Sequence, residues 1–537
     1  MDASERLRQS IDQQRDRLRA DVPPDRPSAI LALLRVRDRL PSGSGSEAPP
    51  DLISGHRLAD PGGNRALQLC LEAIADADMG LPPASPVDGL DGWAERFLLD
   101  CGQLAEAELI LSHVESGSMR LVEDSHGAFD AWIATKRPPA TWRERADIDW
   151  WAAWLARNHG PELRALAFGR RDSAPADPGG ETHYRRLAGI HLEMMAYQLG
   201  YPPDAMIDGC TVQTYRDVLG LLIGWALAAR DRGEEAAQQA ERSLVAAIAS
   251  ALDADPTVIG RAVAAFTLDR ESAAWHAAVP GVAAAPLVRV GPDRLVWSLY
   301  GLTTEPLFFL TRELRRRATN DYNASAHLRE DVFRRDLYAL FPDRRFVTGA
   351  SQVKLRRDDG DLRTDVDAVV FDRKTGTLGI FELKSQDPFA RSAAELVRQR
   401  DNVLYANRQV SGVLTWLNRH GADEILGRVD ARTARTFRVQ KVYPFVLGRY
   451  LVHFDDGPAP DRRAAWGTWP EVLRLIDGES FQATDANPIA SLFTRLTRDG
   501  SLVRPPTDGH QPAIVVGNDR LTVHSSWAAF QARATAR

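Results

Sequence analysis

Cysteine is scarce in this sequence: Cys70, Cys101 and Cys210 are the only three in 537 residues. They are scattered along the chain without the close spacing that zinc ligands have, and so few thiols exclude a disulfide framework. We therefore predict free thiols packed in hydrophobic cores, as is usual in the reducing cytoplasm.

Long hydrophobic runs are missing as well. The most apolar stretch, residues 218–229, has about twelve residues, whereas a helix needs about 20 apolar residues to cross a membrane. The N-terminus does not pair a basic stretch with an apolar run, as a signal peptide does. We expect a buried helix at 218–229, no membrane partner and a cytoplasmic protein.

A general excess of positive charge is also absent. The formal net charge is −6 and the sequence pI is about 6.1, so the whole chain does not have the composition of a basic nucleic-acid-binding protein. Residues 321–457 differ, with about 23 Lys plus Arg against about 20 Asp plus Glu, which leaves about −9 elsewhere. This asymmetry mildly favours a polyanion-binding domain in that region.

Length and turn-forming residues divide the chain into several units. A chain of 537 residues predicts about two to four compact domains. Helical patterns dominate the N-terminal half and strands alternate with helices later, so the expected fold class is multidomain α plus α/β. The expected units are an N-terminal helix and linker at 1–64, an α-helical domain at 65–280, a hairpin and connecting helix at 281–320, a mixed-sheet α/β domain at 321–457, and a small C-terminal appendage at 458–537.

Local signals add detail to the first 320 residues. Asp2 and Glu5 have the spacing of a capping pair for a short helix that docks on a partner or on its own chain. Residues 41–64 are rich in Gly, Pro and Ser and predict a loop. The tryptophan cluster at 150–154 favours core packing over base stacking. The basic run at 315–317 favours a solvated helix end over a DNA contact.

Residues 321–457 alternate between helical and strand patterns, as a mixed α/β domain does. The predicted elements are a helix from about 324 to 340, strands at 346–355, 366–371 and 378–384, a helix at 391–409 and, after a helical insertion, a strand at 439–447.

The second and third of these strands join through residues 372–377, whose Asp and Gly predict a hairpin turn. Antiparallel pairing across this turn places Asp367 opposite Glu382. Strand alternation puts Glu382 and Lys384 on one face, while the apolar residues beside them face packed helices. Opposed carboxylates repel each other, so the arrangement favours a bound divalent cation, and oxygen ligands suit Mg²⁺ or Mn²⁺.

These residues, TDVDAVVFD followed by GIFELKSQ, resemble the PD-(D/E)xK nuclease superfamily over residues 321–457. The resemblance implies a restriction-endonuclease-like mixed sheet and a Mg²⁺-dependent phosphodiesterase that acts on DNA, more as an endonuclease than as an exonuclease. It also implies that Asp367 and Glu382 bind the metal, assisted by the backbone carbonyl of Leu383. Lys384 would then orient or activate the attacking water.

Other positions match the family less closely. Glu330 corresponds to its acidic residue in the preceding helix, and Gln399 to its supporting polar residue in the following helix. Val366 stands where the family has proline, and Asp365 is an alternative metal ligand to Asp367 because it lies on the same strand face. Arginines near the site would either hold phosphates or remain solvated surface charges. They are Arg391, Arg398, Arg400 and Arg408.

Lysine is rare in this chain, which has five lysines and 62 arginines among its 67 basic residues. Lys384 therefore departs from the usual cation, and its compact ammonium suits a water-orienting role that guanidinium would fill poorly. Two alternatives stay open. Glu382 and Lys384 could form an exposed ion pair of little energetic value, or the domain could bind nucleic acid or serve assembly without catalysis.

The architecture also suggests a setting for an active enzyme. By analogy, the helical N-terminal half would control the nuclease, as in bacterial defence or restriction effectors. Such control would act through a protein partner or through self-association of that half.

Overall fold

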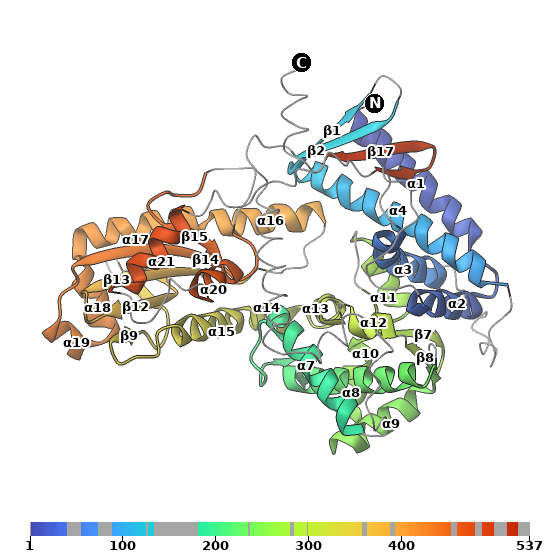
Figure 1. The fold of residues 1–537 in the computed structure, drawn as a ribbon, viewed down its shortest axis with the longest axis horizontal. Coiled ribbons are helices and arrows are strands. Elements are labelled where there is room, and N and C mark those ends of the chain that lie inside the picture. The colour runs from blue at the N-terminus through green and yellow to red at the C-terminus, as the bar shows by residue number, and fades with distance from the viewer. Residues whose placement is uncertain are drawn as a thin grey trace.

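The computed structural model has a multidomain α plus α/β architecture (Figure 1). It describes residues 2–39, 55–72, 89–124, 127–133, 181–234, 237–279, 284–297, 299–304, 306–356, 362–386, 392–452, 459–477, 486–498 and 513–524. The tryptophan cluster at 150–154 lies outside these described residues, as do residues 134–180 of the predicted α-helical domain at 65–280.

Four helices form the first packing unit. Asp2 caps the first helix by accepting a hydrogen bond from the backbone amide of Glu5 at 2.8 Å, which confirms one half of the predicted capping pair, while the Glu5 carboxylate accepts from Arg8 at 2.7 Å. This helix docks on its own chain, because Leu7, Ile11 and Leu18 are buried against the neighbouring helices. The helices are α1 (Ala3–Asp21), α2 (Arg26–Arg39), α3 (Gly55–Glu72) and α4 (Asp91–Glu115).

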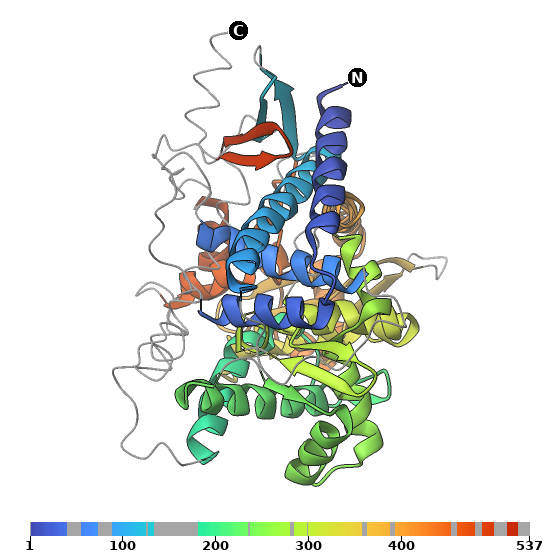
Figure 2. The same ribbon diagram turned by 90° about the vertical axis from the view of Figure 1, so that its right-hand side faces the viewer.

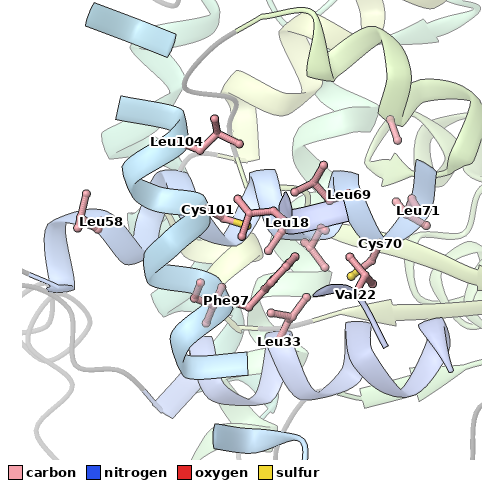
Figure 3. Close-up of a cluster of buried hydrophobic side chains, with 14 of the residues drawn as sticks. Leu18, Val22, Leu33, Leu58, Leu69, Cys70, Leu71, Phe97, Cys101 and Leu104 are labelled. Carbon is pink, nitrogen blue, oxygen red and sulfur yellow. The ribbon is translucent and has the colours of Figure 1, made fainter. Parts of the chain in front are cut away.

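Figure 3 shows the core between these helices, where Leu18, Leu33 and Phe97 point toward one another. Each fully buried side chain of this kind contributes about 1.5–3 kcal/mol to folding. Cys70 and Cys101 lie in the same core as free thiols. Cys210 is also buried and free, so the prediction for all three cysteines is confirmed.

Helix α3 differs from the predicted loop, which extended to residue 64. It begins at Gly55 and contains Pro61 followed by two glycines. A Cβ atom on Gly62 would overlap the backbone of Leu98, and one on Gly102 would overlap the backbone of Leu58. Glycine at these positions allows α3 and α4 to cross at short range. In the sequence, glycines that serve close helix packing look the same as glycines that form a turn, so a loop was predicted.

A hairpin at residues 119–133 and a hairpin near the C-terminus form a four-stranded sheet with the order β1-β2-β17-β16. Strand β17 pairs with β2 in parallel, although the two are far apart in sequence. Figures 1 and 2 show the C-terminal hairpin beside the β1–β2 hairpin, near α1. The strands are β1 (Met119–Glu123), β2 (Phe129–Ile133), β16 (Ala513–Val516) and β17 (Asp519–His524).

A second helical unit follows, with the predicted buried helix at 218–229 lying inside α8. A four-stranded sheet of order β5-β8-β7-β6 packs with it, and its β7–β8 pair is the predicted hairpin. The helices are α7 (Glu181–Leu199), α8 (Val212–Asp231), α9 (Glu241–Leu252), α10 (Pro256–Ala265), α11 (Arg270–Ala277), α12 (Leu299–Thr303), α13 (Pro306–Arg317) and α14 (Thr319–Ala324). The strands are β3 (Met206–Ile207), β4 (Cys210–Thr211), β5 (Ala237–Gln239), β6 (Thr267–Leu268), β7 (Leu287–Gly291) and β8 (Arg294–Trp297).

In the part of the chain that is described, no single helix is long and apolar enough to cross a membrane, although the bent pair α9 and α10 passes that test jointly.

The third unit is built on a five-stranded mixed sheet of order β15-β14-β13-β12-β9. Strands β13, β14 and β15 are parallel neighbours, whereas β12 pairs antiparallel with β13 and β9. The strands of this unit are β9 (Phe346–Thr348), β10 (Val353–Arg356), β11 (Leu362–Val366), β12 (Ala368–Asp372), β13 (Thr377–Lys384), β14 (Lys441–Gly448) and β15 (Ala465–Thr468).

Helices cover both faces of this sheet. Phe381 and Leu383 lie on the face that packs against α15, α20 and α21, while Ile380 lies on the face covered by α17 and α18. The alternation predicted along β13 is therefore confirmed. The helices are α15 (Ala326–Ala339), α16 (Ala393–Leu404), α17 (Ala406–His420), α18 (Ala422–Val429), α19 (Ala431–Thr436), α20 (Trp469–Asp477) and α21 (Pro488–Arg498).

The predicted boundary at residue 457 differs from the structure. Strand β15 extends the central sheet, and Trp469 and Ile489 pack into the same core as Phe381. Residues 513–524 belong instead to the sheet that contains β1 and β2. The described parts of segment 458–537 therefore belong to two units rather than to one appendage. Residues 465–498 complete the central sheet and its core, and residues 513–524 complete the sheet that contains β1 and β2.

Candidate active site

The β12–β13 hairpin sets the geometry of the candidate site. Asp372 fixes its turn by accepting hydrogen bonds from the Lys374 amide at 2.9 Å and the Thr375 hydroxyl at 2.7 Å. The resulting register pairs Ala368 with Phe381. Continuing this register by one residue in each direction brings Asp367 opposite Glu382, as the sequence predicted.

Asp367 occupies a break between two strands. A single strand was predicted at 366–371, but β11 ends at Val366 and β12 begins at Ala368. The Asp367 carboxylate accepts a hydrogen bond from the Leu383 amide at 2.8 Å, and its backbone carbonyl accepts one from Arg334 of α15. Strand β13 and helix α15 thus hold this residue from two sides.

Asp367 and Glu382 are only 6% and 7% exposed, respectively. Burial raises the pKa of Asp367, and the nearby Asp365 adds to the rise. Burial together with the charge of Asp367 raises the pKa of Glu382 well above its usual value. In the absence of a cation, a proton between the two carboxyl groups relieves the repulsion.

Lys384 completes this group from the end of β13. Its Nζ donates to Glu382 Oε1 at 2.7 Å and to Gln409 Oε1 at 2.7 Å. The exposed ion pair considered as an alternative is not what the structure contains, because the Lys384 side chain is 13% exposed and that of Glu382 is 7% exposed. A buried, hydrogen-bonded ammonium has a fixed position and direction.

Gln409 is the site residue that the sequence prediction missed. The family resemblance pointed to Gln399, which is buried on α16, whereas the hydrogen bond to Lys384 comes from α17. A single helix was predicted at 391–409, and the helical backbone runs through Tyr405, with φ −58° and ψ −27° between α16 and α17, and on to His420. The apolar spacing of Val410 and Val413, next to Gln409, was the available signal for this continuation.

Glu330 and Asp365 lie near the carboxylate pair in different ways. Burial raises the pKa of Glu330 to about 7, and the charge of Asp367 contributes to that rise while Lys384 opposes it. Asp365 pairs with Lys354 across the β10–β11 ribbon. The charge of Asp365 raises the pKa of Asp367. Asp367, and not Asp365, accepts the hydrogen bond from the Leu383 amide on β13.

The predicted phosphate-binding arginines are not equivalent. Arg398 and Arg408 are exposed, whereas Arg400 donates to Asp401 at 3.1 Å. Arg408 also lies over the ring of Tyr405, with its Cζ 4.4 Å from the ring centroid. Arg391 lies outside the described residues.

The basic run at 315–317 is neither a solvated helix end nor a free cationic surface. Arg315 bonds Glu395 of α16 at 3.2 Å, and Arg317 bonds Asp208 at 2.8 Å. Arg316 bonds Glu313 at 2.7 Å. The fold brings Glu395 and Asp208 from distant segments to Arg315 and Arg317, which local sequence spacing cannot indicate. Glu313, by contrast, is a local partner of Arg316.

The donor groups suit a small divalent cation. Asp367 and Glu382 supply oxygen ligands, and Leu383, whose carbonyl is the third expected ligand, directly follows Glu382 in sequence. No group of three or more His, Cys, Asp or Glu side chains with metal-binding geometry occurs among the described residues. Magnesium commonly binds proteins through one or two carboxylates and keeps several waters, so two carboxylates are compatible with it.

Comparisons of the chain with protein-family models, with curated proteins and with solved structures found no match.

Proposed function

We propose that this protein is a Mg²⁺-dependent nuclease that hydrolyses phosphodiester bonds, with DNA as the expected substrate. The observation that carries the proposal is the buried pair of Asp367 and Glu382, held across a hairpin beside the ammonium of Lys384. Structural ion pairs do not require two opposed buried carboxylates, which destabilise a sheet in the absence of a cation.

Each residue has a separate role in this proposal. Asp367, Glu382 and the Leu383 carbonyl would hold the cation, which supplies Lewis acidity toward the phosphate and the water bound to it. Lys384 positions the attacking water through its Nζ, and Gln409 keeps that ammonium directed at the site. Exposed Arg398 and Arg408 would hold flanking phosphates.

The test is cleavage by the purified full chain of single-stranded DNA, duplex DNA, supercoiled plasmid and RNA, with magnesium or with EDTA. Lys384→Ala should abolish cutting and leave the circular dichroism spectrum unchanged. Lys374→Ala, which removes an exposed lysine from the hairpin turn, is the matched control and should cut like wild type. Linearised plasmid would identify an endonuclease. Equal cutting by Lys384→Ala and wild type would refute the proposal.

The alternative is a protein that binds nucleic acid or serves assembly without cutting it. It predicts binding in the same panel, with no cleavage by wild type in magnesium or manganese.

We also propose that the helical half controls the site, in keeping with a bacterial defence or restriction effector. Glu395 of α16 accepts hydrogen bonds from Arg312 and Arg315 of α13, at 3.4 Å and 3.2 Å. Because α16 leads directly into the helix that carries Gln409, displacement of α13 by a partner would be transmitted toward Lys384.

A further inference from the structure

Tyr405 is an exposed aromatic residue at the junction of α16 and α17. It is 46% exposed, and the other exposed large hydrophobic residues in the described ranges are Met206 and Val515. A single exposed apolar side chain needs no special explanation. Tyr405, however, lies beside the candidate active site, close to two cationic side chains.

The ring of Tyr405 lies at the edge of the site formed by Asp367, Glu382 and Lys384. The Nζ atom of Lys384 is 6.0 Å from its centroid. The backbone carbonyl of Tyr405 also accepts a hydrogen bond from the Gln409 amide at 3.3 Å. Tyr405 and Gln409 are therefore one helical turn apart on the same face, with Gln409 bonded to Lys384 and the partly exposed Tyr405 ring beside it.

Positive charge accompanies this exposed ring. Arg408 is exposed and its Cζ lies 4.4 Å from the ring centroid, while Lys384 lies on the side of the carboxylate pair. An aromatic face next to cations has the two chemical features that single-stranded nucleic acid requires: a stacking surface for a base and positive groups for the phosphates beside it.

We infer that Tyr405 stacks on an unpaired nucleobase next to the scissile phosphate, so that single strands or unpaired segments are the preferred substrate. This inference rests on the proposed function. In a duplex both faces of each base are covered by neighbouring base pairs, so an exposed ring can stack only where a base is unpaired or flipped out. Stacking accepts any base, so no sequence preference is expected from this contact.

The inference is tested by binding under conditions that prevent cutting. Full-length protein in EDTA is titrated into a fluorescein-labelled oligonucleotide, either single-stranded or duplex, and a parallel single strand carries 2-aminopurine. Tyr405→Ala should weaken single-strand binding on the order of tenfold, with little change for duplex. It should also remove the change in 2-aminopurine fluorescence. Tyr405→Phe and Tyr405→Trp keep the ring and should bind as wild type does.

Val515→Ala removes an exposed apolar side chain from β16 and is the matched control, expected to bind like wild type. Thermal unfolding of each variant checks that exposed Tyr405 is not needed for folding. The inference is overturned if Tyr405→Ala binds single strands as tightly as wild type, if it weakens both forms equally, or if wild type prefers duplex. Matched DNA and RNA strands identify the sugar that the site accepts.

Cleavage measured separately distinguishes this inference from the proposed function. If wild type binds single strands through Tyr405 but cuts nothing with magnesium, the proposed function fails and the stacking surface stands. If wild type cuts with magnesium and Tyr405→Ala cuts and binds every substrate equally well, the stacking inference fails and the nuclease proposal stands.

Discussion

Glu382 illustrates how opposing interactions meet at a single residue. Its carboxyl group faces Asp367, which disfavours its ionised form, and accepts a hydrogen bond from Lys384, which favours that form. Burial intensifies both effects because little solvent screens them. Such a balance changes when a cation replaces the proton, so the protonation of this pair is expected to depend on magnesium.

Gln409 provides a sharp test of positioning. Gln409→Ala should lower kcat by about tenfold to a hundredfold, as loss of an orienting hydrogen bond commonly does, and leave KM unchanged. Because the ammonium of Lys384 loses its neutral acceptor, chemistry should slow while substrate binding is retained, a separation of kcat from KM that a merely structural role would not produce. Gln399→Ala is the control suggested by the sequence resemblance. An equal loss in both variants, or a change in KM alone, would contradict this assignment.

Glu330 gives the unfolding free energy a predictable pH dependence. Its pKa is about 7 in the folded protein against an ordinary value of 4.5. A raised folded pKa contributes stability at low pH that is lost as the pH rises from about 4.5 through 7. In wild type without metal, this effect should lower the free energy of unfolding by up to about 3 kcal/mol across that pH range. In Glu330→Gln the decrease should be absent, as measured by urea unfolding in EDTA.

The matched control for Glu330 is Glu424→Gln, which alters an exposed carboxylate paired with Arg428. It should follow the wild-type pH dependence because solvent screens that pair. A parallel pH profile for wild type and Glu330→Gln would show that the Glu330 carboxyl titrates normally.

At the scale of secondary-structure elements, hairpins were the most predictable feature. The turn at 372–377 and the β7–β8 hairpin follow local rules. Asp side chains accept hydrogen bonds from nearby backbone amides in a turn, and Gly adopts the positive φ angles that a tight turn requires. Gly376, for example, has a φ of 66°. The residues facing each other across the β12–β13 hairpin could therefore be counted from the turn.

Helix boundaries depend on tertiary packing and were harder to predict. Neither Pro nor Gly marks the junction at Tyr405. Ser392 and Glu395 form a capping box that starts α16, and Val413 anchors α17 on the sheet. The hydrogen bond to Lys384 comes from Gln409 rather than from Gln399, and the packing of α17 on the sheet, not local sequence, selects that residue.

The α3–α4 crossing predicts opposite effects for two helical glycines. Gly102→Ala should destabilise the protein by about 1–3 kcal/mol, because the new methyl group would overlap the Leu58 backbone. Gly189→Ala is the matched control: it lies in α7 with open space around its Cβ position and should stabilise by about 1 kcal/mol. Denaturant unfolding measures both. A neutral Gly102→Ala would show that the helices can separate without penalty.

At the scale of the whole molecule, long-range pairing set the limit of prediction. The chain places β17 beside β2 and β15 at the edge of the central sheet, and no local pattern identifies partners so far apart in sequence. The coarse division into a helical half and a later α/β unit followed from periodicity. The boundary at residue 457 did not, because strand patterns do not reveal the sheet to which a strand belongs.

The contact between the helical half and the α/β unit is where the proposed control of the site would act. Helix α16 contacts α4 as well as α17, and Glu395 lies between its own cap and two arginines of α13. Movement of the helical units therefore has a direct structural route to the site.

Asp367 and Glu382 are expected to hold a divalent cation together. Counting bound Mn²⁺ by electron paramagnetic resonance of the free ion, on the full chain at neutral pH, tests this most directly. Wild type and Asp365→Asn should retain the site, whereas Asp367→Asn and Glu382→Gln should lose it. Equal Mn²⁺ binding by all four proteins, no binding by wild type, or loss in Asp365→Asn with retention in Asp367→Asn would contradict the account.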